Sequence, residues 1–151
     1  MPQGWKKTSG KCWDKGEEHM TCSERAHEIH KQGFNCAQAV FAAFAENYGI
    51  TREQALKLCA SFGGGLAGSG ECCGAALGML MALGMAEGFA QPDMAKKQAH
   101  NARVREAMKL FEERFGAVRC PDLKGGRVPC AEIVEGAAEI AAQMLSHGSA
   151  D

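Results

Sequence analysis

The chain has no excess of charge of either sign. Lys and Arg number 17 against 18 Asp and Glu in 151 residues, which gives a net charge of -1. No run of basic residues marks a surface for a phosphate backbone. The sequence therefore predicts no nucleic-acid partner.

Long hydrophobic runs are missing as well. The longest run, residues 75–86, is far shorter than the roughly 20 apolar residues that a helix needs to cross a bilayer. The first seven residues, MPQGWKK, lack the apolar region of a secretory signal. We therefore expect no membrane partner and a cytoplasmic location, where cysteines more often bind metals or react than form structural cross-links.

No segment alternates apolar and polar residues in the manner of a half-buried strand. Apolar residues instead recur at helical spacing, so the predicted fold class is all-α. We expect a compact bundle of about five to six helices, with a glycine-rich loop before a central apolar helix. Residues 1–20 are polar and aperiodic and are interpreted as an N-terminal arm, and residues 21–147 as a single helical domain.

Polar capping residues mark several helix starts. Thr21 with Glu24 and Thr51 with Gln54 form capping-box patterns, and Asn35 is placed to cap a further helix. Residues 117–129 carry no helical pattern and are expected to be irregular. The predicted helices cover residues 21–33, 36–48, 51–62, 72–88, 92–115 and 130–147.

Two histidines, His27 and His30, lie one turn apart on the first predicted helix. Histidines at this spacing can share a metal ion. On a helix this polar, however, they more often belong to a solvated face. We interpret them as solvated.

Eight cysteines are the most informative residues that the chain contains. The vicinal pair Cys72 and Cys73 lies between a glycine-rich loop and the apolar helix, where the partial positive charge of a helix N-terminus lowers a thiol pKa. A buried free cysteine more often only fills core space. Eight cysteines exceed what average composition supplies, and we expect a thiolate site here.

The loop before this pair, residues 63–70, contains five glycines in eight residues. It is either a flexible linker or a tight loop whose backbone approaches a partner closely. It lacks the Gly-Lys-Ser/Thr ending of a phosphate-binding loop, and no strand pattern precedes it, so nucleotide binding is disfavoured.

Four cysteines share one kind of position. Cys36 and Cys73 fall in first helical turns, Cys130 begins the last helix, and Cys120 lies in the segment just before it. Helix starts can gather at one end of an antiparallel bundle. Four thiolates that meet at one point would bind a metal.

These residues also carry a resemblance to a known family. The runs NCAQAV (35–40), FGGG (62–65), GECCGAALG (70–78) and CPDL (120–123), together with Cys130, resemble the C_GCAxxG_C_C family of redox-active proteins over residues 21–147. The resemblance implies that the family cysteines are Cys36, Cys73, Cys120 and Cys130, and the family is similar to the cysteine-bearing part of split-Soret cytochromes, where an iron–sulfur centre is suspected. Cys12, Cys22, Cys59 and Cys72 lie outside the pattern.

The leading hypothesis is that the four family cysteines bind an iron–sulfur cluster for electron transfer with an unidentified redox partner protein. The glycine backbone would donate N–H groups to the cluster, with Gly64, Gly65, Gly70 and Gly74 as the predicted cofactor-binding residues.

Two other hypotheses stay open. The first is a metal-free thiol–disulfide oxidoreductase in which Cys73 attacks and Cys72, Cys36 or Cys120 resolves the mixed disulfide. The second is a structural zinc site on the same four cysteines. Whether the protein is an enzyme is undecided. A homodimer is an alternative to a single chain, because the predicted helix 72–88 carries Gly74, Gly78, Gly84 and Gly88 and can pack closely against a second copy.

Overall fold

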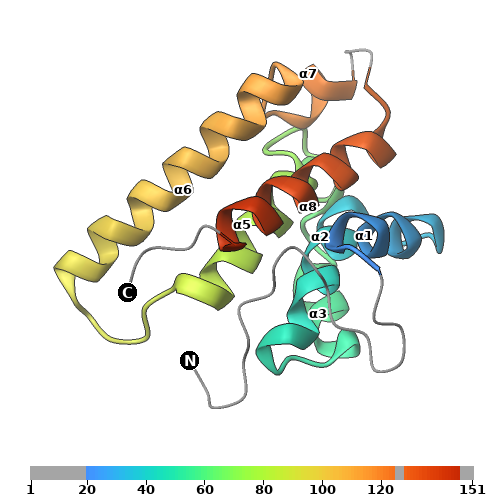
Figure 1. Cartoon of the computed structure of the whole chain (residues 1–151). Helices are drawn as coiled ribbons and strands as arrows, with labels where there is room; N and C mark the ends of the chain where they lie inside the picture. The colour runs from blue at the N-terminus through green and yellow to red at the C-terminus, as the bar shows by residue number, and fades with distance from the viewer. Residues whose placement is uncertain (1–19, 125–127, 147–151) are drawn as a thin grey trace.

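The computed structural model, shown in Figure 1, describes residues 20–124 and 128–146. Over these residues no strand is found, and the predicted all-α class is confirmed. Apart from Met20, the expected N-terminal arm lies outside the described residues. The longer helices are α1 (Cys22–Lys31), α2 (Cys36–Ala45), α3 (Arg52–Cys59), α5 (Gly74–Glu87), α6 (Met94–Phe115) and α8 (Cys130–Ser146), and the short ones are η1 (Glu46–Tyr48), α4 (Gly63–Leu66) and α7 (Cys120–Lys124).

The predicted caps of α1, α2 and α3 are all present. The side chains of Thr21, Asn35 and Thr51 each accept a hydrogen bond from the backbone N–H of the third helical residue, whose side chain bonds back to the cap. Such a cap stabilises a helix by about 1 kcal/mol. Local sequence therefore sets where these three helices begin.

Two apolar helices, α2 and α5, form the centre of the bundle. Eight of the ten residues of α2 are buried, and α2 packs against α1, α3, α5 and α8. Gly78 of α5 permits the close approach of α2, because a Cβ there would lie 2.8 Å from the carbonyl oxygen of Ala37. The predicted central helix therefore shares the core with α2.

The helices α5 and α8 run side by side in the same direction, and α6 lies along them in the opposite direction (Figure 1). Arg103 of α6 joins the C-terminal ends of α5 and α8. Its guanidinium donates to the Glu87 carboxylate at 2.7 and 3.0 Å and to the Met144 carbonyl at 2.7 Å. Their N-terminal ends, with Gly74 and Cys130, lie at the other end of the bundle. No helix in the described part of the chain is both long and apolar enough to span a membrane.

Two differences from the prediction lie next to the vicinal cysteines. The apolar helix begins at Gly74 rather than Cys72, because the backbone of residues 71–73 pairs with residues 118–120 through an isolated antiparallel bridge between Cys72 and Arg119. The segment expected to be irregular contains α7, which follows directly from this bridge. Both differences arise from a contact between segments far apart in the sequence.

Candidate thiolate site

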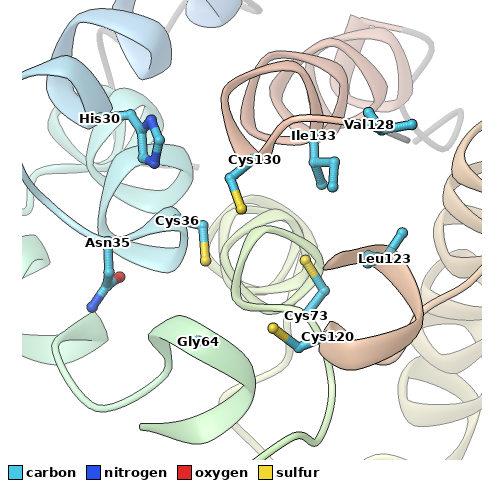
Figure 2. Close-up of a pocket in the computed structure, with 10 residues that line it drawn as sticks. All are labelled: His30, Asn35, Cys36, Gly64, Cys73, Cys120, Leu123, Val128, Cys130 and Ile133. Atoms are coloured by element: carbon cyan, nitrogen blue, oxygen red, sulfur yellow. The ribbon is translucent and has the colours of Figure 1, made fainter. Parts of the chain in front are cut away.

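One cavity of about 110 Å³ is lined by all four cysteines of the predicted site, Cys36, Cys73, Cys120 and Cys130. Figure 2 shows their sulfur atoms directed toward a common space, with His30 and Asn35 on one side and an apolar wall on the other. The structure thus brings together four sulfurs from distant segments. The lining residues are His30, Asn35, Cys36, Gly64, Cys73, Cys120, Leu123, Val128, Cys130 and Ile133.

Each of these cysteines lies at the start of a helix. Cys36, Cys120 and Cys130 are the first residues of α2, α7 and α8, and Cys73 is the N-cap of α5. The first N–H groups of a helix have no intrahelical acceptor and carry a partial positive charge. The ends of the three longer helices, α2, α5 and α8, therefore favour negative charge in the cavity between them.

Backbone hydrogen bonds fix Cys73 next to Cys120. The N–H of Cys73 donates to the carbonyl of Val118 at 2.8 Å, and the N–H of Cys120 donates to the carbonyl of Glu71 at 2.8 Å. Both thiols are buried. Main-chain hydrogen bonds therefore fix the backbone positions of these two cysteines relative to each other.

The glycine-rich segment is a tight left-handed turn and not a flexible linker. Residues 64–67 all have positive φ, and two of them, Leu66 (68°) and Ala67 (58°), carry side chains. A left-handed conformation costs an L-residue about 1–2 kcal/mol. The turn places Gly64 in the lining of the cavity, and strain of this kind is often found at functional sites.

Two further glycines let the cysteines approach. A Cβ at Gly65 would lie 2.6 Å from the Cβ of Cys120, and a Cβ at Gly74 would lie 2.6 Å from the Sγ of Cys36. Gly70 is farther from the sulfurs, with Pro121 as the nearest neighbour of a Cβ built there, at 3.5 Å. Of the four predicted cofactor-binding glycines, Gly70 therefore has the least direct relation to the cavity.

Burial determines the state of the Cys73 thiol. It raises the pKa of Cys73 to about 11, against hydrogen bonds from the N–H groups of Ala76 and Ala75 that lower it, and the neighbouring thiols of Cys36 and Cys120 raise it further. The expectation that the helix N-terminus makes Cys73 a ready thiolate is therefore wrong for the protein without a bound cation. A positive partner is needed to hold the sulfur as a thiolate.

Among the described residues, the other cysteines do not line the cavity. Cys72 is half-buried, and burial raises its pKa; its pairing with Cys73 as attacking and resolving thiols stays a prediction. Cys59 is fully buried with its Sγ 3.5 Å from the Sδ of Met81. Cys22 is buried and disulfide-bonded, and Cys12 lies outside the described residues.

One cavity residue was not expected from the sequence. His30 is half-buried and lines the cavity, so its interpretation as a solvated histidine is wrong. His27 has a different environment, because its Nδ1 lies 2.6 Å from a carboxylate oxygen of Glu135 and its side chain is 41% exposed. The spacing of Ser23, His27 and His30 along one face of α1 is the signal in the sequence that could have identified His30.

The donor side chains do not form a compact shell in the described part of the chain. Within residues 20–124 and 128–146, no three His, Cys, Asp or Glu side chains are close enough together to hold one metal ion. Around a tetrahedral zinc ion with Zn–S bonds of about 2.3 Å, sulfurs lie about 3.8 Å apart. The four thiols therefore share a cavity without forming the tight shell of a single ion.

Comparison with known proteins identifies the family to which the chain belongs. Residues 34–144 match the model of the family described as "Putative redox-active protein (C_GCAxxG_C_C)". The chain is also similar to an uncharacterised protein of Archaeoglobus fulgidus, with 30% identity over 145 residues that cover 85% of this chain and 96% of the relative. No solved structure matches the chain.

Proposed function

The chain belongs to the C_GCAxxG_C_C family of redox-active proteins, and on this premise we propose that its four converging cysteines bind an iron–sulfur cluster that transfers electrons. One observation carries the proposal. Cys36, Cys73, Cys120 and Cys130, each from the start of a different helix, line a single cavity. Thiolates are the usual protein ligands of such clusters.

The electrostatics of the cavity support an anionic group with several thiolates. The N-termini of α2, α5 and α8 supply partial positive charge, and the N–H groups of Ala75 and Ala76 donate toward the Cys73 sulfur. Burial alone would keep this thiol neutral. Iron in the cavity would supply the positive charge that stabilises the thiolates, and binding would release their protons.

The space between the thiols suits a cluster. The four thiols line one cavity of about 110 Å³, and a group with several metal atoms can occupy such a space. The left-handed turn at residues 64–67 brings backbone to the same cavity, where an N–H group can bond to a cluster sulfur.

The surroundings also suit electron transfer. Cys73 and Cys120 are buried on one side of the cavity, whereas Cys130 is exposed. The buried side excludes water from the centre, and the exposed cysteine gives a redox partner a short path to it. A bound cluster would supply the one-electron chemistry, and the chain holds it, insulates it and sets its potential.

The test is the metal content of protein purified without oxygen. We expect visible absorbance together with iron and acid-labile sulfide in equal amounts. Colourless protein with one zinc ion per chain would favour the structural alternative, and metal-free protein with titratable thiols the thiol–disulfide alternative. Either result would overturn the proposal.

Single Cys→Ser variants then assign the ligands. Serine at position 36, 73, 120 or 130 should lower the iron and sulfide content, because each change removes one thiolate. Cys59→Ser and Cys72→Ser are matched controls, since neither residue lines the cavity, and both should retain the wild-type content. Loss of iron in Cys72→Ser with full retention in Cys73→Ser would contradict the proposed ligand set.

A further inference from the structure

We propose that His30 is a positioning residue that donates a ring N–H to a thiolate on the open side of the site and thereby raises the reduction potential of the centre. This inference rests on the proposed function. His30 and Cys130 both line the cavity, and Figure 2 shows them on the side away from Leu123. Hydrogen bonds to cluster ligands are an established means by which proteins tune potentials.

The packing of α1 against α8 places His30 at this position. The Ser23 hydroxyl lies 3.4 Å from Glu139, and one turn later His27 lies 2.6 Å from Glu135. The two helices therefore run antiparallel. Each further turn toward the C-terminus of α1 lies against a turn of α8 that is closer to the N-terminus of α8. The residue that follows on the same face of α1 is His30. It lies opposite the first turn of α8, which begins with Cys130.

The imidazole of His30 is also available to donate a hydrogen bond into the cavity. Within the described part of the chain, no hydrogen bond or ion pair is found for its imidazole. Asn35, the other polar lining residue, is already engaged at both ends of its amide. Its oxygen accepts from the N–H of Gln38 at 2.9 Å, and its nitrogen donates to the carbonyl of Ala60 at 3.1 Å.

The effect on the potential has a definite sign. A donor at a thiolate sulfur withdraws electron density and stabilises the reduced, more negative state of the centre. Neutral imidazole carries one N–H, so donation does not require protonation of the ring. Removal of this donor should therefore lower the reduction potential.

The experiment compares His30→Leu, His30→Gln and His27→Leu with the wild type in the iron-loaded protein. The first variant removes the donor, the second keeps one, and the third changes the neighbouring histidine that faces Glu135. Iron and sulfide per chain are measured first, followed by the midpoint potential and the electron paramagnetic resonance spectrum of the reduced centre.

We expect His30→Leu to reduce the ratio of reduced to oxidised protein at a fixed applied potential by about tenfold, which corresponds to about 59 mV for a one-electron couple. The spectrum should change as well. His30→Gln should restore most of the potential, and His27→Leu should match the wild type. If His30→Leu loses the centre while the other two variants keep it, the requirement for a donor is still supported.

Three outcomes would overturn the inference. The first is a loaded His30→Leu protein with unchanged potential and spectrum. The second is an equal shift in the His27 and His30 variants, which would indicate a general effect of α1. The third is loss of the centre in both His30 variants but not in His27→Leu, since glutamine retains a donor. A wild type without iron and sulfide would instead reject the proposed function, and this inference with it, before any potential is measured.

Discussion

The two ends of α5 are built in opposite ways. At its C-terminal end, Glu87 and Arg103 form a largely buried ion pair that also bonds to the last turn of α8 through the Met144 carbonyl. At its N-terminal end, Cys73 and Gly74 face thiols and backbone, and no ion pair is found there among the described residues.

This difference indicates which end serves stability and which serves chemistry. At the C-terminal end of α5, the far end from the cysteines, the charges of Glu87 and Arg103 neutralise each other, so no bound ion is required there. The cysteine end brings together helix N-termini, a strained left-handed turn and the Cys73 thiol, which burial keeps neutral. The proposed cluster would offset the cost of this arrangement, because its metal ions would stabilise the thiolates.

The largest effect is expected from Gly65→Ala at the cysteine end. Gly65 has φ of +70°, and a Cβ there would lie 2.6 Å from the Cβ of Cys120 and 3.0 Å from the backbone of Glu71. Left-handed strain and overpacking together should lower the free energy of unfolding by about 3 kcal/mol. Chemical denaturation measures this change, and the iron content of the variant should fall as well.

Gly68→Ala is the matched control for this substitution. Gly68 also has positive φ, at +84°, but a Cβ there meets nothing within 4 Å. It should cost only the backbone strain of about 1 kcal/mol and leave the iron content unchanged. Equal losses in the two variants would show that the contact with Cys120 has no particular importance.

At the far end, Arg103→Met should lower the free energy of unfolding by about 2 kcal/mol, because Glu87 then lies largely buried without its partner. Lys57→Met is the control, since Lys57 pairs with Glu53 at positions that are 76% and 77% exposed, and it should cost less than about 0.5 kcal/mol. Folded Arg103→Met protein should keep its iron. Selective loss of iron would contradict the separation of the two ends.

Two glycine substitutions within α5 should change the free energy of unfolding in opposite directions and by smaller amounts. A Cβ at Gly74 would lie 2.6 Å from the Sγ of Cys36 and 2.7 Å from the carbonyl oxygen of Phe62, so Gly74→Ala should cost about 1–2 kcal/mol. Gly84 has open space around a Cβ, and Gly84→Ala should stabilise the helix by about 1 kcal/mol. Thermal unfolding distinguishes them, and a destabilised Gly84→Ala would show that open space is not the deciding factor.

Local features of the chain were predictable because their causes are local. The capping pairs that begin at Thr21 and Thr51 require only neighbouring residues. The gathering of the four cysteines was expected because three of them lie at predicted helix starts and Cys120 lies in the segment just before the last helix. These parts of the fold and of the site could therefore be derived from sequence alone.

The remaining features depend on contacts between distant segments. The bridge between Cys72 and Arg119 shifts the start of α5, and no local pattern indicates it. The pKa of Cys73 depends on how deeply other segments bury the thiol, because burial raises this pKa while the helix N-terminus lowers it. His30 reaches the cavity only because α1 packs against α8 in one register. Each of these requires knowledge of tertiary packing.

The smallest change is expected at Cys59, which tests whether a buried thiol away from the site stays inert. Burial raises its pKa to about 12, whereas an exposed cysteine titrates near 8.5, so the Cys59 thiol should stay neutral at pH 8.5 and still at pH 10. In folded, metal-free protein, iodoacetamide should modify the exposed Cys130 and leave Cys59 unmodified at both pH values, as followed by mass spectrometry. In denaturant both should react. If Cys59 reacted as fast as Cys130 in the folded protein, the core around α3 would open readily, and the contrast between an open cysteine site and a closed remainder of the molecule would fail.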